Sequence, residues 1–188
     1  MLILGIDVST AVTAYTLMDT ERPQIDCLIK SDGIHLSKFK RIYDKAEHLR
    51  EHFRNLKNDY DIDRIYVEEA LQSFRRGLSS AKTLSTLMRF NGIVCFLAEE
   101  TFQKEVNLVN VVKARSALGL KINRKLDKNT KDQVFDWVKT REEFTNFSWP
   151  MKTLKSGPRA GKTIFDKSCY DISDAAIMSL YGFSDINS

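Results

Sequence analysis

Five acidic residues of this sequence stand where apolar segments begin or end, a placement that suits metal binding or acid–base chemistry. Asp7 ends an apolar run that starts at the amino terminus, and Glu68 and Glu69 end a second apolar run. Asp171 and Asp174 are three residues apart at the start of an apolar segment, so a helix would carry both on one face. These acids are therefore the first candidates for a functional site.

Each of these acids also has an ordinary structural explanation. Asp7 can cap the turn that follows it, strands commonly end in an acid, and acids in a first helical turn complement the helix dipole. The joint pattern is more informative, because helix-crossed parallel strands leave a sheet at one edge and a packed helix can bring its first turn there. Adjacent strand residues point to opposite faces, so only one of Glu68 and Glu69 can face Asp7.

Four carboxylates that meet at one edge could not all stay ionised near neutral pH without cations between them. Oxygen ligands of this kind favour Mg²⁺ or Mn²⁺, and two such ions roughly 3.5–4 Å apart are a common arrangement for phosphodiester hydrolysis. The acids therefore predict a site for divalent cations.

The hydrophobic periodicity predicts an α/β fold that could bring these acids together. Three closely spaced strands predict an antiparallel meander, after which helices and strands alternate and two further strands run parallel. We expect one domain over residues 1–188, with a mixed five-stranded sheet (three antiparallel strands, then two parallel) and helices on both faces. The predicted strands are 1–8, 11–18, 24–30, 64–69 and 106–111, and the predicted helices are 39–56, 80–101, 113–118, 130–147 and 169–181.

The composition is that of a folded chain with a core of its own. With 43% hydrophobic and 29% charged residues and only 8 Gly and 3 Pro among 188 residues, the disordered, fibrous and low-complexity classes are excluded. No apolar run reaches the ~18 residues of a membrane span, and no signal peptide is recognisable. Cys27, Cys95 and Cys169 are widely spaced. We expect reduced thiols, a cytoplasmic location and no membrane association.

The net charge of +4 is concentrated in residues 148–169. Of 29 bases and 25 acids in the chain, five bases and one acid lie here, and the remainder balances at 24 of each. Because this segment also contains two prolines and two glycines, we expect a mobile basic loop suited to a polyanion, a solvated surface loop being the plain alternative. Its bases are Lys152, Lys155, Arg159, Lys162 and Lys167.

Three short motifs make the chain resemble the RuvC-type Holliday junction resolvases of the RNase H-like superfamily, and most of all their phage-borne members. The motifs are Gly5-Ile6-Asp7-Val8-Ser9, Tyr66-Val67-Glu68-Glu69-Ala70 and Asp171-Ile172-Ser173-Asp174-Ala175-Ala176. Each motif is short and weakly specific alone. Their order, and the elements expected to carry them, match over nearly the whole chain.

The resemblance implies a metal-dependent crossover junction endodeoxyribonuclease of DNA recombination and repair, which nicks four-way and branched DNA and leaves 5′-phosphates. By resemblance, Asp7 bridges two Mg²⁺ ions, for which Mn²⁺ can substitute, and Glu68, Asp171 and Asp174 complete their coordination. Glu68 is preferred to Glu69 because the family has its acid directly after the apolar strand residues. The alternatives are an RNase H-like nuclease acting on flaps or RNA–DNA hybrids, and a non-catalytic module that binds branched DNA.

The resemblance also implies a homodimer and an aromatic residue that reaches the junction centre. Ten of the fifteen residues 84–98 are apolar, so this helix is expected to be buried on two sides, either in a two-fold dimer or sandwiched within one subunit. Phe74, flanked by Arg75 and Arg76, could stack on a base while the arginines neutralise phosphates. The usual position of the aromatic residue is held here by Leu71.

Two further motifs resemble sites of other chemistry. Residues 156–163 imitate a phosphate-binding P-loop, but their glycine spacing is too short and no apolar strand precedes them, so we expect no nucleotide cofactor. His48, Glu51 and His52 match a zinc-peptidase string. Both histidines lie beside the apolar stripe of their helix without a clear third ligand, so we interpret them as surface residues.

Overall fold

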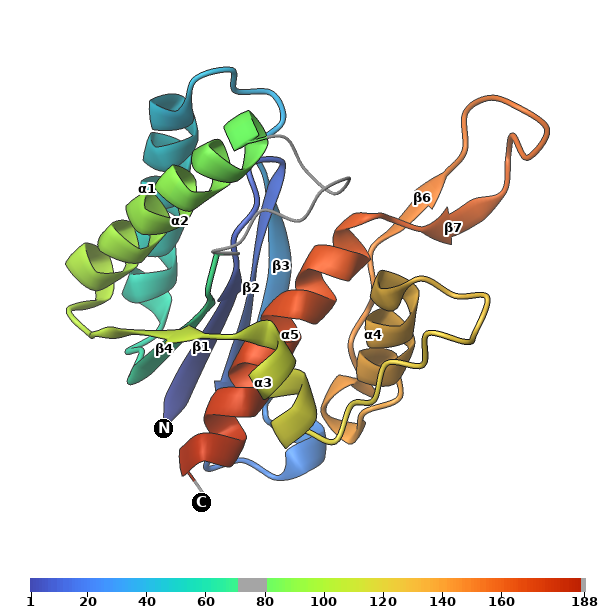
Figure 1. Ribbon diagram of the computed structural model, residues 1–188. Coiled ribbons are helices and arrows are strands. Elements are labelled where there is room, and N and C mark those ends of the chain that lie inside the picture. The colour runs from blue at the N-terminus through green and yellow to red at the C-terminus, as the bar shows by residue number, and fades with distance from the viewer. Residues whose placement is uncertain (71–80, 187–188) are drawn as a thin grey trace.

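A computed structural model describes residues 1–70 and 81–186, and a mixed five-stranded sheet with the strand order β3-β2-β1-β4-β5 forms its centre (Figure 1). The first three strands are antiparallel, whereas β4 runs parallel to β1 and β5 runs parallel to β4. The predicted sheet is confirmed. Its strands are β1 (Leu2–Asp7), β2 (Val12–Asp19), β3 (Leu28–His35), β4 (Arg64–Glu68) and β5 (Val106–Val109).

Helices cover both faces of this sheet, as the sequence predicts (Figure 1). One face carries α1 (Ile42–Asp59) and α2 (Ala81–Phe102), and the other carries α3 (Val111–Ala117), α4 (Thr130–Lys139) and α5 (Ser168–Ile186). Leu4 and Ile6 pack in the core on the first face, whereas Ile3 packs in the core on the second, as the period of two along a strand requires. None of the described helices is both long and apolar enough to cross a membrane.

Helix α5 lies directly on β1 because Gly5 has no side chain. A Cβ atom at Gly5 would come within 2.4 Å of the Ser179 backbone nitrogen and 2.5 Å of the Ala175 carbonyl oxygen. Neither backbone atom can move aside as a flexible side chain could. The close approach brings the first turn of α5 to the edge of the sheet where β1 and β4 end (Figure 1).

Some of the predicted boundaries are wrong, for local reasons. The strand expected at 24–30 starts only at Leu28, because Gln24–Asp26 after Pro23 form a short 3-10 turn, and it continues to His35. The helix expected at 130–147 ends at Lys139, where a second 3-10 turn (Glu142–Phe144) follows. The apolar residues beyond it are aromatic rings that pack on one another and do not extend a helical stripe.

The basic segment predicted as a mobile loop contains a β-hairpin, with β6 (Met151–Thr153) paired to β7 (Thr163–Phe165). It projects from the body of the molecule beside the start of α5 (Figure 1). Its base is anchored on α4, where the Phe135 ring lies 4.9 Å from Trp149 and 5.1 Å from Phe165. Residues 156–162 of the stretch that imitates a P-loop lie in the turn of this hairpin, with Gly157 and Gly161 in the left-handed region that favours glycine, and Thr163 begins β7.

Candidate functional site

The structure brings the four predicted acids to one pocket. Asp7 and Glu68 are the last residues of the neighbouring parallel strands β1 and β4, and Asp171 and Asp174 lie in the first turns of α5. They line a cavity of about 230 Å³ at this edge of the sheet. The turn after β1 is held by the Ser9 hydroxyl, which accepts from the backbone N–H of Ala11, so Asp7 is not needed as its cap.

Burial and mutual repulsion act on the two strand-end acids. The pKa of Asp7 is raised well above its ordinary value, first by burial and then by the negative charges of Glu68, Asp174 and Asp171. Burial and the charge of Asp174 raise the pKa of Glu68 to about 7, although its carboxylate is hydrogen-bonded to the Asp7 carboxyl. The edge therefore concentrates negative charge that the protein alone neutralises only in part.

Two bases that the sequence analysis did not single out contact the acids of α5. The Nη2 atom of Arg115, on α3, lies 2.9 Å from Oδ1 of Asp174, and both side chains are largely buried. Lys131, on α4, is more exposed, and its Nζ lies 3.7 Å from Oδ1 of Asp171. Burial still raises the pKa of both aspartates, while Arg115 and Lys131 oppose that shift.

The Glu68 side chain interacts with Asp7 and Asp174, and its choice over Glu69 as a metal ligand stays a prediction. Both glutamates line the pocket, but the carboxylate that contacts Asp7 and is repelled by Asp174 is that of Glu68. Asn91 fixes the end of β4 from the other side of the sheet, because its buried side-chain amide donates to the Glu68 carbonyl oxygen at 3.0 Å. Helix α2 thus helps to position the site.

The carboxylates fit a divalent cation by their chemistry, although their side chains do not yet converge in a coordination geometry. Within residues 1–70 and 81–186, no three His, Cys, Asp or Glu side chains converge as metal ligands. Arg115 and Lys131 contact two of the acids instead. Four carboxylates without a nitrogen or sulfur ligand are the donors that Mg²⁺ and Mn²⁺ prefer. Because burial and mutual repulsion disfavour their ionised forms, added positive charge would stabilise these forms.

The predicted DNA-binding residues fall into three groups. Lys155, Arg159 and Lys162 are exposed in the turn region of the hairpin, and Lys167 is exposed just before α5. Lys152 pairs with Asp166 at 3.3 Å, so its charge is partly neutralised. The third group, Phe74, Arg75 and Arg76, lies outside the described residues, as does Leu71.

A second basic segment borders the acids. Its charge does not appear in the sum over the residues outside 148–169, because acids elsewhere in the chain balance it. Residues 111–131 contain seven bases and one acid, Asp127. Arg115 and Lys131, which contact the site, lie in this segment on α3 and α4. Counting charges in a short window along the sequence would have found this segment, whereas the net charge of all residues outside 148–169 does not reveal it.

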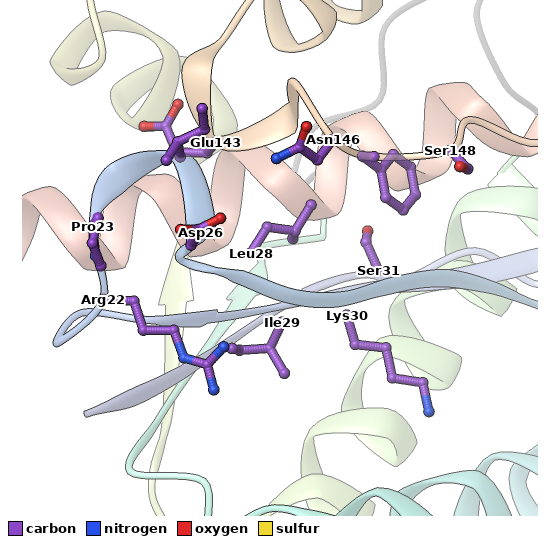
Figure 2. A pocket seen from close by; sticks show the side chains of 12 residues that line it. Arg22, Pro23, Asp26, Leu28, Ile29, Lys30, Ser31, Glu143, Asn146 and Ser148 are labelled. Atoms are coloured by element: carbon purple, nitrogen blue, oxygen red, sulfur yellow. The ribbon is translucent and has the colours of Figure 1, made fainter.

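Two other places that could carry chemistry lie apart from the acidic pocket. Leu28 and Ser31 point from β3 towards the segment that carries Asn146 and Ser148, across a groove of about 710 Å³ (Figure 2). The buried carboxylate of this groove, Glu143, is already held by Arg141 at 2.7 Å. On α1, the Nε2 atoms of His48 and His52 are 3.2 Å apart, and the described residues provide no cluster of three ligands there.

The fold is that of solved Holliday junction resolvases. No protein-family model and no curated protein matches the sequence. The structure of Thermus thermophilus RuvC in complex with a Holliday junction substrate is similar with a TM-score of 0.60 and 14% identity, covering 96% of this chain and 93% of that one.

Two further resolvases align over the chain. The yeast mitochondrial Holliday junction resolvase Ydc2 gives a TM-score of 0.55 at 12% identity, covering 97% of this chain and 77% of that one. The fowlpox virus resolvase, solved with Holliday junction DNA, gives 0.51 at 13% identity, with both chains fully covered. The resemblance in the sequence motifs is therefore confirmed at the level of the fold, which this chain shares with RuvC and related resolvases.

Proposed function

We propose that this chain is a Holliday junction resolvase, a divalent-metal-dependent endonuclease that nicks four-way and branched DNA. The observation that carries the proposal is the meeting of Asp7, Glu68, Asp171 and Asp174 at one edge of a sheet with the resolvase fold. We take residues 1–188 to act as one nuclease domain. A crossover junction endodeoxyribonuclease of this kind would leave 5′-phosphates.

The four acids would hold two Mg²⁺ ions, with Mn²⁺ as a substitute. Asp7, which interacts with all three other acids, is the best placed to serve both ions. When bound, such ions supply an activated water and neutralise charge at the scissile phosphate. Arg115 orients the Asp174 carboxylate, and Lys131 adds positive charge beside Asp171 where a phosphate would approach.

A cleavage assay tests the catalytic proposal. Purified protein is incubated with a labelled four-way junction, a linear duplex and an RNA–DNA hybrid, with and without Mg²⁺. We expect Mg²⁺-dependent nicking of the junction, a loss of at least ~100-fold for Asp7→Asn, and no loss for the exposed control Asp61→Asn. An undiminished Asp7→Asn rate would refute the metal site, and equal cutting of the linear duplex or the hybrid would refute junction selectivity.

We also propose that the chain acts as a homodimer through α2, because a four-way junction needs two symmetric nicks. Phe90 and Val94 are buried against the sheet, but Met88 and Phe96 on the outer side are 45% and 60% exposed. Within the described part of the chain this outer side stays about half exposed, which favours the dimer over a helix sandwiched within one subunit. An exposed apolar face of this kind suits a two-fold interface.

A matched pair of surface substitutions tests the dimer. Phe96→Asp puts a charge into the proposed interface, whereas Tyr43→Asp changes a residue of similar exposure (65%) on α1. In sedimentation experiments we expect wild type and Tyr43→Asp to be dimeric and Phe96→Asp to be monomeric. A monomeric wild type, or a Phe96→Asp variant that dimerises as wild type does, would contradict the proposal.

A further inference from the structure

A second, basic pocket lies between α3 and α4, and the proposed hydrolysis makes no use of it. The pocket has a volume of about 330 Å³, and no acid is among the residues that line it. Its polar lining consists of three bases and two hydroxyl side chains, namely Arg115, Lys121, Arg124, Ser116 and Thr130. This combination offers positive charge and hydrogen-bond donors to an anion.

The pocket is built on a connector, residues 118–129, that is fixed to the body of the protein. Gln133 of α4 accepts from the Asn123 backbone N–H at 2.8 Å and donates to the carbonyl oxygens of Asn123 and Lys128 at 3.0 and 2.9 Å. Leu120 is buried in the core, and its backbone N–H donates to the Arg115 carbonyl oxygen. These contacts hold the basic side chains around a preformed concavity.

The charges around the pocket are available to a ligand. Lys121 and Arg124 are exposed, and no acid of the described residues lies within ion-pair distance of either, whereas Lys128 of the same connector is paired with Asp136 at 2.7 Å. Arg115 uses Nη2 for Asp174, and its buried Nε has no hydrogen-bond partner in the described part of the chain. The two unpaired charges of Lys121 and Arg124, together with the free Nε–H of Arg115, favour an anion in this hollow.

We propose that this pocket binds a backbone phosphate of the DNA strand that runs through the proposed active site. Guanidinium, ammonium and hydroxyl groups are the usual partners of DNA phosphates, and such contacts set the register of a strand without reading its sequence. Arg115 lines the pocket and also contacts Asp174, so the pocket adjoins the acidic site, and we assign its phosphate to the strand that would be cut there. The inference rests on the proposed function and adds a subsite to it.

The salt dependence of junction binding tests this subsite directly. Lys121→Gln combined with Arg124→Gln removes two charges from the pocket, and Lys40→Gln combined with Arg54→Gln removes two exposed charges beside and on α1 as a matched control. Affinities are measured in EDTA over a range of salt concentrations. We expect the slope of log K against log[salt] to fall by roughly 0.9 for each lost contact in the pocket variant, and not in the control. Equal slopes for the two variants would overturn the proposal.

Free phosphate and nucleotides share the chemistry of a backbone phosphate, so a second measurement separates them. Inorganic phosphate and a mononucleotide are titrated into wild type and the pocket variant by calorimetry. Binding to wild type alone, together with an unchanged DNA slope in the variant, would mean a site for free phosphate and would also overturn the proposal. Weak or no binding of either small anion, together with the reduced slope, is the expected result.

Failure of the subsite and failure of the nuclease remain distinguishable, because binding is measured without cleavage. A wild type that cuts junctions while both double variants bind alike leaves the nuclease intact and refutes the subsite. A reduced slope in the pocket variant of a protein that cuts no DNA keeps the subsite and refutes the nuclease. All substituted side chains are exposed, so thermal unfolding should match wild type, and the single variants Lys121→Gln and Arg124→Gln provide the same test one charge at a time.

Discussion

The acidic edge and the two basic segments of this protein are built in opposite ways. The acids come from residues 7, 68, 171 and 174, on three elements far apart in the sequence, and they meet because the core forces them together. The bases of residues 111–131 and 148–169 lie close together along the sequence within each segment and are mostly exposed. The acidic edge therefore opposes folding through burial and repulsion, whereas the basic surfaces add little repulsion of this kind.

The two basic segments also differ from each other. The hairpin stands away from the body and is anchored by aromatic packing at its base (Figure 1). The connector 118–129 lies against the body, and the pocket that it helps to form shares Arg115 of α3 with the acidic site. We therefore expect the connector to position a strand at the site, and the hairpin to contribute mainly to affinity.

The largest expected effect separates the two neighbouring acids at the end of β4. Glu68→Gln removes a proposed metal ligand and should lower the cleavage rate by at least ~100-fold, whereas Glu69→Gln is the matched control with a much smaller effect. The measurement is single-turnover cleavage of a junction with Mg²⁺ at saturating protein. A larger loss for Glu69→Gln would assign the ligand to the other glutamate.

The second prediction concerns the stability of the acidic edge without metal. Because burial and the charge of Asp174 raise the pKa of folded Glu68 from an ordinary 4.5 to about 7, the folded state binds more protons than the unfolded state between these values. The free energy of unfolding should therefore fall as the pH rises from about 4.5 to about 7, by at most ~3 kcal/mol from this group.

Urea unfolding in EDTA measures this dependence. The acids whose pKa values are lowered, such as Asp166, titrate below this window and do not compete with it. Glu68→Gln should flatten the fall, and Mg²⁺ should restore stability near pH 7. A free energy of unfolding that rises from pH 4.5 to pH 7 in EDTA would contradict the predicted destabilisation by the buried acids.

The site acids could be predicted from the sequence because each leaves a local signal. Asp7 and Glu68 end apolar runs, and Asp171 and Asp174 have helical spacing. Because neighbouring parallel strands end at the same edge of a sheet, these signals were enough to predict that the four acids meet. Arg115 and Lys131 lie in a segment that a local charge count reveals, but no spacing within it marks these two residues as contacts of the acids. Their contacts depend on how α3 and α4 pack on α5, which is decided by tertiary packing and not by local spacing.

The hairpin shows a different limit of the sequence. Glycine and proline mark chain reversals, and the same composition serves a mobile loop or a tight turn between short strands. The aromatic contacts of Trp149 and Phe165 with Phe135 favour the hairpin, and they join residues near both ends of the segment to a separate helix. Phe144 and Phe147 show the same limit, because they continue an apolar pattern after Lys139 but pack on each other and on Trp149 outside any α-helix.

The third prediction compares two glycines that the structure treats differently. Gly5→Ala pushes a Cβ into the backbone of α5, so it should destabilise the protein by about 1–3 kcal/mol and reduce cleavage by displacing Asp171 and Asp174 from the edge. Gly92→Ala, in α2, meets nothing within 4 Å and should raise stability by up to about 1 kcal/mol. Urea unfolding of both variants measures these changes. A Gly5→Ala variant as stable as wild type would contradict the close packing of α5 on β1.

The smallest expected effect compares two bases of the hairpin. Arg159 is exposed in the turn and should contact a phosphate, so Arg159→Gln is expected to reduce the salt slope of junction binding by roughly 0.9. Lys152→Gln should reduce the slope less, because Asp166 already neutralises much of that charge at 3.3 Å. Since neither base lines the acidic pocket, the cleavage rate at saturating protein should stay at the wild-type value for both variants. A reduced saturated rate for Arg159→Gln would mean that the hairpin positions the strand for cleavage, a task that the comparison of the two basic segments gives to the connector alone.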